Sequence, residues 1–410
     1  MSSAAATQSR IDVRSAFPAL NQEVNGKRLV YLDNAASSQV CAASIEAVDH
    51  FYRFDRANVH RGEHTLGQRA TTAMERARVQ MQAFLNAAYV DEVVFTSGTT
   101  EALNLLAGTF GVGLSAGDEV LITHMEHHSN IVPWQLLAQR SGIVLKVAPV
   151  TDSGELDMDA FVALLGPRTK LVSVVHVSNA LGTINPVEEI VRAAHARGIP
   201  VMLDGAQAAP HLCVDVQALD ADFYCLSGHK LFGPNGIGVL YGKRDRLRAL
   251  PPWKGGGDMI ESVSFEGTTF AEPPARFEAG TPNVAGIVGL GAAAHWLMTQ
   301  DRKALFAMEH ELTLAATEAL SQISGLRLIG TASKKVGVCS FVMDGVPGSD
   351  VGFILDKFGV AVRTGHHCTE PLMRRFGVPG TIRASFAFYN TTEDVDTLAK
   401  GLHAVQRMVG

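Results

Sequence analysis

The chain contains few cysteines, and their number and spacing argue against a disulfide framework and against a zinc site. Five cysteines, an odd number, are spread over 410 residues at positions 41, 213, 225, 339 and 368. They do not form the pattern of a disulfide framework, and no Cys-x-x-Cys pair indicates a zinc site. Because such usage is typical of a reducing compartment, we expect the protein in the cytoplasm.

An excess of positive charge and long apolar runs are also lacking. The formal net charge is −6, from 35 Lys and Arg against 41 Asp and Glu, and no basic stripe appears. This argues against a protein that binds a nucleic-acid backbone. No stretch approaches the roughly 18 uninterrupted apolar residues of a transmembrane helix, and residues 1–10 lack the apolar core of a secretory signal. We therefore expect neither a nucleic-acid partner nor a membrane span.

The composition and the order of the expected elements are those of an α/β enzyme. Hydrophobic residues make up 47% of the chain and charged residues 19%, and the length suffices for a large core in two domains. From about residue 90 to 240, short apolar runs alternate with helical segments such as 101–107. This predicts a mainly parallel sheet covered by helices on both faces. The expected strands are 92–96, 119–123, 145–148, 171–176, 201–203 and 236–241.

Past residue 290 the pattern changes to that of a smaller α+β domain. Two long helices are expected over 292–310 and 311–323, followed by shorter strands and two further helices. The strands are expected at 326–328, 338–342 and 382–386, and the helices at 351–358 and 393–409. We divide the chain into an N-terminal arm that joins the small domain (1–19), a large domain (20–290) and a small C-terminal domain (291–410).

A carboxylate and a lysine suggest a pyridoxal-phosphate site. Asp204 closes the apolar run 199–203, and Lys230 follows 26 residues later. A carboxylate at the end of a buried strand needs a cationic partner, and the protonated pyridine nitrogen of pyridoxal phosphate is one. The cofactor aldehyde in turn needs a lysine for its Schiff base. Taken singly, each residue is also explained by a turn or a loop.

The segment 97–101, Ser-Gly-Thr-Thr-Glu, joins an expected strand to the start of a helix. Unpaired N–H groups, the helix dipole and the hydroxyls of Thr99 and Thr100 predict a site for the cofactor phosphate. An ordinary N-cap would use the same residue types. Ser227 and His229, beside Lys230, are natural additional phosphate donors.

Further polar positions suggest binding or chemistry. His127 could lie flat on the pyridine ring, although adjacent histidines in a loop are commonly solvated. Cys368 lies in a polar loop near His366, His367 and Arg363, which can favour the reactive thiolate. A metal site built from those neighbours competes with this idea. Neighbouring residues rarely converge on one ion, and we expect no metal. Cys213 and Cys225, in apolar surroundings, are expected to be packing residues.

Arg383 interrupts an otherwise apolar strand. A bidentate substrate carboxylate would fit its guanidinium fork, and a structural salt bridge with an Asp or Glu is the alternative. His60 and His64, four residues apart, could suggest a metal pair. The Arg61-Gly62 step between them indicates a loop instead.

Together these segments resemble the SufS-type (group II) cysteine desulfurases, a branch of the class V aminotransferases among the fold-type I pyridoxal-phosphate enzymes. The resemblance runs from about Phe17 to the C-terminus and implies the corresponding α/β fold. It rests on the segments 31–36, 58–62, 99–101, 126–128, 177–182, 204–207, 227–231, 276–283 and 363–368, which follow one another in the order of that family.

The resemblance implies a cofactor site in which each residue holds one part of pyridoxal phosphate. Lys230 would bond to the aldehyde, and His127 would stack on the ring. Asp204 would hold the pyridine nitrogen and Gln207 the phenolic oxygen. The phosphate ligands would be Thr99, Thr100, Ser227 and His229, with Thr281 reaching the cofactor of a partner subunit.

The resemblance also implies a substrate and a reaction. Asn179 and Arg383 would hold the substrate carboxylate, with Arg363 and His60 nearby. Cys368 would accept sulfur from L-cysteine as a persulfide, with L-alanine as the other product. A homodimer, a SufE-like acceptor protein and iron–sulfur cluster assembly are implied as well. Selenocysteine lyase and cysteine-sulfinate desulfinase activities on the same site remain alternatives. Thr369 departs from the small residue usual after the acceptor cysteine, and we expect it to tune the behaviour of the loop.

Overall fold

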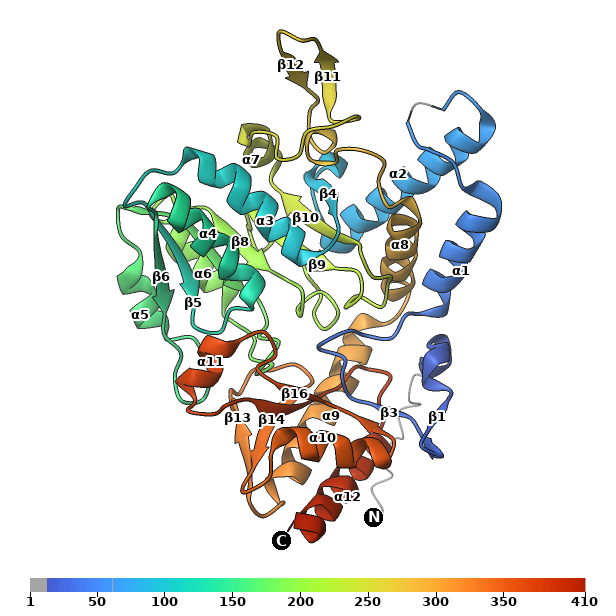
Figure 1. Cartoon of the computed structure of the whole chain (residues 1–410), viewed down its shortest axis with the longest axis vertical. Coiled ribbons are helices and arrows are strands. Elements are labelled where there is room, and N and C mark those ends of the chain that lie inside the picture. Colours follow the sequence, from blue (N-terminus) through green and yellow to red (C-terminus); the bar gives the residue numbers. More distant parts are fainter. Residues whose placement is uncertain (1–12, 61, 410) are drawn as a thin grey trace, which may run out of the picture.

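A computed structural model of the chain describes residues 13–60 and 62–409, with a seven-stranded sheet in its upper part (Figure 1). The strand order is β4-β10-β9-β8-β7-β5-β6. Neighbours from β9 to β6 pair in parallel, whereas β10 runs antiparallel to both β4 and β9. The expectation of a mainly parallel sheet is confirmed. The strands are β4 (Val93–Thr96), β5 (Glu119–Thr123), β6 (Val144–Ala148), β7 (Thr169–Val175), β8 (Val201–Asp204), β9 (Phe223–Ser227) and β10 (Gly238–Gly242).

Helices cover both faces of this sheet. Apolar side chains alternate between the two faces along each strand, so both faces need a covering layer. Val93 and Phe95 pack into one hydrophobic core and Val94 into another, because successive strand residues point to opposite faces. The first core contains residues of α2 (Thr65–Leu85), α5 (Met158–Leu164), α6 (Val187–His195) and α8 (Val284–Met298), with α1 (Ala42–His50) packed on α8. The second contains residues of α3 (Thr99–Phe110), α4 (Val132–Ser141) and α7 (Arg244–Ala249).

The C-terminal part is built on a four-stranded antiparallel sheet of order β13-β14-β17-β16. Its strands are β13 (Leu326–Ile329), β14 (Val338–Met343), β16 (Arg363–Gly365) and β17 (Thr381–Ser385). Helices α9 (Arg302–Ser321), α10 (Gly348–Lys357) and α12 (Thr392–Val409) accompany this sheet, and the short α11 (Glu370–Arg375) lies between β16 and β17 in the chain.

The predicted boundary between the two long helices was wrong. The first helix, α8, ends at Met298, and α9 begins at Arg302 instead of near residue 311. Asp301 explains the break, because its side chain accepts a hydrogen bond from the Ala304 N–H at 3.1 Å. An N-cap of this kind satisfies a free backbone donor and starts a new helix within an apolar pattern that suggests continuity.

The N-terminal segment runs along the C-terminal sheet before it reaches α1. Strand β3 (Val30–Tyr31) pairs in parallel with β15 (Val360–Ala361), and the Ser385 N–H donates to the Leu32 carbonyl at 2.7 Å. Val30 and Leu32 are buried among residues of α12 and the C-terminal strands. Residues 32–37 therefore lie at the junction of the two parts of the molecule. Most of the expected arm over 1–19 lies outside the described residues.

Three further features complete the architecture. A hairpin of β11 (Ile260–Val263) and β12 (Thr268–Phe270) projects at the top of Figure 1.

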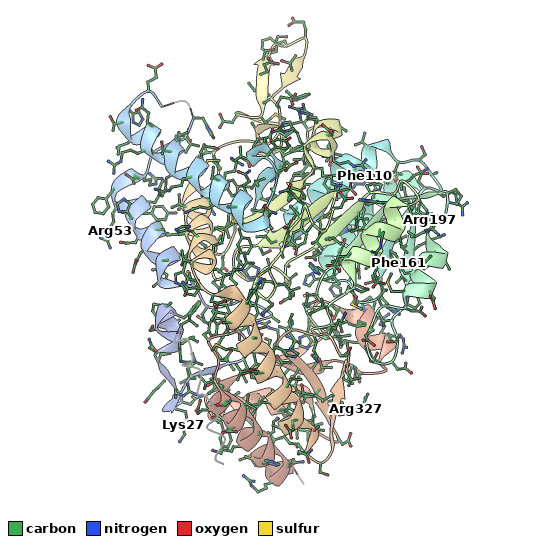
Figure 2. All side chains as sticks on the ribbon, turned by 180° about the vertical axis from the view of Figure 1, so that it is seen from behind. Lys27, Arg53, Phe110, Phe161, Arg197 and Arg327 are labelled. Carbon is green, nitrogen blue, oxygen red and sulfur yellow. The ribbon has the colours of Figure 1, made fainter. Side chains whose placement is uncertain are left out.

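Viewed from behind, the labelled cations Lys27, Arg53, Arg197 and Arg327 lie at the rim of the molecule, whereas Phe161 is buried (Figure 2). Within residues 13–60 and 62–409, no helix has the length and apolar character needed to cross a bilayer.

Candidate active site

A cavity of about 430 Å³ lies between the loops that follow the strands of the large sheet and the strands β16 and β17. This volume is in the range of small-molecule sites. Twelve of the residues predicted from the sequence line it: Thr99, Thr100, His127, Asn179, Asp204, Gln207, Ser227, His229, Lys230, Arg363, Cys368 and Arg383. The cavity therefore brings together residues from 99 to 383 in the chain.

Asp204 and Lys230 form the electrostatic centre of the cavity. Asp204 ends β8, is buried, and accepts one hydrogen bond, from the Ala206 N–H at 3.0 Å. Burial raises the pKa of Asp204, although the Ala206 N–H and Lys230 oppose this shift. Burial lowers the pKa of Lys230 to about 8, with Asp204 acting in the opposite direction. The bond from the Ala206 N–H is to Oδ1, which leaves Oδ2 for a bound cation.

Several polar atoms around the cavity are buried without a hydrogen-bond partner. They are Asn179 Oδ1, Gln207 Oε1, His367 Nδ1 and Arg383 Nε, and all four residues line the cavity. Gln207 is fixed by its Nε2, which donates to the Ala35 carbonyl at 2.5 Å. Buried polar atoms normally have partners, so this concentration of unpaired ones indicates a polar ligand. A ring with a cationic nitrogen near Asp204 and a hydroxyl that donates to Gln207 Oε1 fits these groups.

The phosphate end of the cavity lies at the start of α3. The N-cap residue is Gly98, with φ of +147°, so no side chain caps this helix. The alternative of an ordinary Ser or Thr N-cap was therefore wrong. Ser227 Oγ accepts from the Thr99 N–H and donates to Thr99 Oγ1, both at 2.9 Å, which joins the ends of β4 and β9. A helix start whose own N-cap residue has no side chain, with hydroxyls beside it, is suited to an anion.

His127 lines the cavity as a neutral imidazole. Its Nδ1 accepts a hydrogen bond from the Ser129 N–H at 3.1 Å and lies 2.8 Å from Ser129 Oγ. Burial lowers the pKa of His127 to about 3, and Lys230 adds to this shift. A neutral ring can pack against an aromatic cofactor without bringing a second cation close to Lys230.

The loop that carries Cys368 is held in a defined conformation. Cys368 is exposed, lines the cavity, and has φ of +56°, which is unusual for a residue with a side chain. The His128 N–H donates to the Cys368 carbonyl at 2.7 Å, and Asn179 Nδ2 donates to the His367 carbonyl at 2.7 Å. Thr369 is buried, and its hydroxyl donates to the His366 carbonyl at 2.8 Å. These bonds fix the backbone while leaving the thiol accessible.

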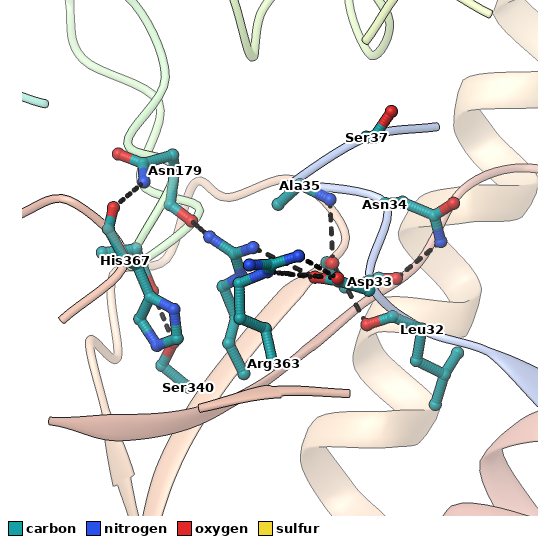
Figure 3. A network of polar contacts seen from close by, with 12 residues as sticks. Leu32, Asp33, Asn34, Ala35, Ser37, Asn179, Ser340, Arg363 and His367 are labelled. Carbon is teal, nitrogen blue, oxygen red and sulfur yellow. Dashed lines mark hydrogen bonds and ion pairs between the residues drawn. The ribbon is translucent and has the colours of Figure 1, made fainter. Parts of the chain in front are cut away.

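Two arginines form the end of the cavity nearest the C-terminal sheet. Arg383 is buried in β17, and burial lowers its pKa to about 10, so the side chain remains cationic at neutral pH. Arg363, in β16, is half-exposed. Both contact the carboxylate of Asp33, and Figure 3 shows the contact of Arg363. Arg383 therefore forms the salt bridge that was the alternative for this residue, and its Nε has no partner. Its binding of a substrate carboxylate stays a prediction.

Other sequence expectations fall outside this cavity. His60 is exposed with φ of +67°, and Thr281 is exposed; neither lines the cavity of its own chain. His64 caps α2, because its Nδ1 accepts from the Gly67 N–H at 3.1 Å, which accounts for it without a metal. Cys225 is buried as expected, but Cys213 is exposed, so its assignment as a packing residue was wrong. Cys213 lies in a segment without helix or strand, between the half-buried Leu212 and the buried Val214.

Three residues near the site were missed. Asp33 is a long-range partner of both arginines. Glu126 is fully buried and accepts from the Val175 N–H at 3.0 Å, and burial raises its pKa to about 7. The ring of Tyr224 is so close to Gly205 that a Cβ there would lie 2.0 Å from it. The glycine after Asp204 was the one signal that could have indicated such a close approach.

Comparisons with known proteins point to one family. The model of the class V aminotransferases matches residues 30–398. A cysteine desulfurase from Dickeya dadantii (strain 3937) is 52% identical over 400 residues, which is 97% of each chain. The structure of the cysteine desulfurase CsdA from Escherichia coli is similar with a TM-score of 0.90 and 40% identity, over 97% of this chain and 98% of that one. A cysteine desulfurase from Thermococcus onnurineus NA1 gives 0.90 and 39%, over 96% and 98%.

Proposed function

The chain belongs to the class V aminotransferase family, and on that premise we propose that it is a pyridoxal-phosphate-dependent cysteine desulfurase of the SufS type. It would convert L-cysteine to L-alanine and retain the sulfur as a persulfide on Cys368. The observation that carries this proposal is the single cavity lined by Lys230, Asp204 and an exposed Cys368. An aminotransferase that only exchanged amino groups would have no use for this thiol.

Pyridoxal phosphate is the cofactor of the family, and the cavity fits it. Lys230 would hold the aldehyde carbon, Asp204 the ring nitrogen and Gln207 the phenolic oxygen. The phosphate would lie at the start of α3, among Thr99, Thr100, Ser227 and His229. When bound, the cofactor supplies an electron-withdrawing ring that stabilises negative charge on the substrate Cα.

Lys230 would move the proton in this reaction. Its pKa of about 8 is much closer to neutrality than that of an exposed lysine, so the uncharged amine is available as a base at Nζ. The amine would take the Cα proton of the substrate and later return a proton towards alanine. Arg383 would hold the substrate carboxylate while this occurs, because its buried Nε–H has no partner. Asn179 would assist through its amide Nδ2, which in this structure donates to the His367 carbonyl.

Cys368 would take the sulfur. Its thiolate sulfur would attack the substrate sulfur, so that a new S–S bond forms while the Cβ–S bond of the substrate breaks. The electron pair of the broken bond remains with the carbon fragment, which becomes alanine after protonation. Cysteine and an enzyme thiol thus give alanine and an enzyme persulfide, with no external oxidant.

The persulfide would be passed to an acceptor protein of the SufE kind for iron–sulfur cluster assembly, in the reducing cytoplasm. We also propose that two copies form a homodimer. His60 and Thr281 are exposed and lie outside the cavity of their own chain, so a second copy would use them. The segment before His60 carries two exposed apolar residues, Tyr52 and Phe54, which a subunit contact would cover.

Two related activities are possible on the same residues. Selenocysteine and cysteine sulfinate can release their leaving groups without a protein thiol, whereas cysteine cannot. The Cys368→Ala enzyme therefore distinguishes them: it should lose activity on L-cysteine and retain activity on the other two substrates. Kinetics with all three substrates in wild type would then establish the preference.

The direct test is incubation of the holoenzyme with L-cysteine and a reductant. Equal amounts of alanine and sulfide are expected from wild type. The Cys368→Ala variant should keep its cofactor absorbance and form neither product. Full desulfuration by that variant would refute the role of Cys368, and absence of both products from wild type would refute the activity itself.

A further inference from the structure

The carboxylate of Asp33 contacts both arginines of the cavity and is shared unequally by them. Figure 3 shows its contact with Arg363. Arg363 makes a two-pronged contact with the Asp33 carboxylate, from Nε to Oδ1 at 3.0 Å and from Nη2 to Oδ2 at 2.7 Å. Arg383 makes one longer contact, from Nη2 to Oδ1 at 3.3 Å. Fork-to-fork pairing is the stronger geometry, so Asp33 holds Arg363 more firmly than Arg383.

Arg383 keeps donors free for another anion. Its Nη1 donates to the Asn179 carbonyl at 3.0 Å, and its buried Nε has no partner. Arg383 lines the cavity. Because a buried unpaired guanidinium N–H is costly, this arginine is suited to a carboxylate ligand.

The position of Asp33 is fixed by its backbone. The Asp33 carbonyl accepts from the Ala36 N–H at 3.1 Å, and the Ala35 N–H donates to Ser385 Oγ at 2.9 Å. Ser385 belongs to β17, the strand that also carries Arg383. The Asp33 side chain is 14% exposed, compared with 50% for Arg363. A well-ordered carboxylate therefore anchors an arginine that would otherwise extend into solvent.

We propose that Asp33 is a positioning residue, which holds Arg363 beside Arg383 so that the pair binds the α-carboxylate of the substrate. The negative charge of Asp33 also cancels one of the two arginine charges, so the three side chains together carry one net positive charge. That charge matches an amino acid whose side chain is neutral, and it disfavours one with a second anionic group. The identity of the substrate as L-cysteine rests on the proposed function, whereas the recognition of an α-carboxylate can be measured without turnover.

The alternative role for Asp33 is competition with the substrate for the two arginines. If Asp33 instead competed with the substrate for the arginines, its removal would tighten carboxylate binding. The geometry favours positioning, because the contacts of Asp33 are concentrated on Arg363 and leave Nε of Arg383 unpaired. The two roles predict opposite signs for one measurement.

The test is titration of the wild-type and Asp33→Asn holoenzymes with L-alanine and with ethylamine, which lacks the carboxylate, followed by cofactor absorbance. We expect Asp33→Asn to weaken L-alanine binding roughly tenfold and to leave ethylamine binding unchanged. The KM for L-cysteine should rise by a similar factor, with a smaller change in kcat. Asp33→Glu, which keeps the charge, should restore part of the affinity.

Asp91→Asn is the matched control, because Asp91 pairs with Arg244 Nε at 3.0 Å and Nη2 at 2.8 Å and does not line the cavity. It should leave both ligands unaffected. Tighter or unchanged L-alanine binding in Asp33→Asn would overturn the proposal, and so would equal weakening of both ligands. If wild type binds L-alanine in this way but does not desulfurate L-cysteine, the proposed function fails while the role of Asp33 stands.

Discussion

The backbone carbonyl of Cys368 accepts a hydrogen bond from the backbone N–H of His128 at 2.7 Å. This bond joins the loop of the proposed sulfur acceptor to the loop that carries the cavity residue His127. A second tie lies nearby, since the Glu370 N–H donates to His128 Nε2 at 3.1 Å. The exposed thiol thus lies on a backbone held against the loop that follows β5, and under the proposed function its delivery to the substrate would depend on these ties.

Thr369 should control the mobility of this loop. Thr369→Ala removes the bond from its hydroxyl to the His366 carbonyl, which is worth about 1 kcal/mol. We expect alkylation of Cys368 by iodoacetamide to become roughly fivefold faster, because opening becomes easier by that amount. Thr369→Ser keeps the hydroxyl and is the control. Equal rates in the Ala and Ser variants would show that the hydroxyl does not restrain the loop.

The pKa of Lys230 predicts how cofactor loading depends on pH. Only the uncharged amine reacts with the aldehyde, and the Lys230 pKa of about 8 means that this form increases up to about pH 8 and then levels off. The rate of loading into apo protein should rise about tenfold for each pH unit below 8. Absorbance after rapid mixing measures this rate. A rise that continued to pH 10 would show that the cavity does not lower the pKa of Lys230.

Asp204 should lower the stability of the protein without cofactor and raise the stability of the protein that holds it. Its pKa is raised by burial, so its contribution to stability is fully present below the unfolded-state pKa and is lost as pH rises through the folded-state pKa. Asp204→Asn should therefore make apo protein melt at a higher temperature at pH 7. The same change should reduce the stabilisation by cofactor, because the ring nitrogen loses its charged partner. Thermal unfolding of wild type and of Asp204→Asn, each with and without cofactor, measures both effects. A lower apo Tm in Asp204→Asn than in wild type would contradict this account.

His127 should contribute through its ring rather than through a proton. Its pKa of about 3 keeps it neutral across the working range, and its Nδ1 is engaged by Ser129. His127→Phe should therefore retain more cofactor affinity than His127→Ala, and neither variant should shift the acid limb of the pH–rate profile. Equilibrium titration with cofactor measures the first effect. An acid limb displaced in His127→Phe would show that the imidazole titrates during turnover.

The sequence allowed much of the site to be predicted, because its chemistry lies in short local segments. Asp204 at the end of a buried run and Lys230 beside two hydroxyl or imidazole donors are visible without a fold. Asp33 was not predictable in this way, since its partner Arg363 is 330 positions away and the pairing exists only after β3 and β15 come together. The start of α9 was missed because the cap of Asp301 is a local effect within a continuous apolar pattern.

A single turnover of the holoenzyme without reductant tests whether Cys368 receives the sulfur that is released at the cofactor site. Wild type in excess over L-cysteine should form one alanine for each cysteine added and gain the mass of one sulfur atom on the peptide that contains Cys368. Alanine formed without that sulfur, or sulfur found on Cys213 instead, would contradict the account.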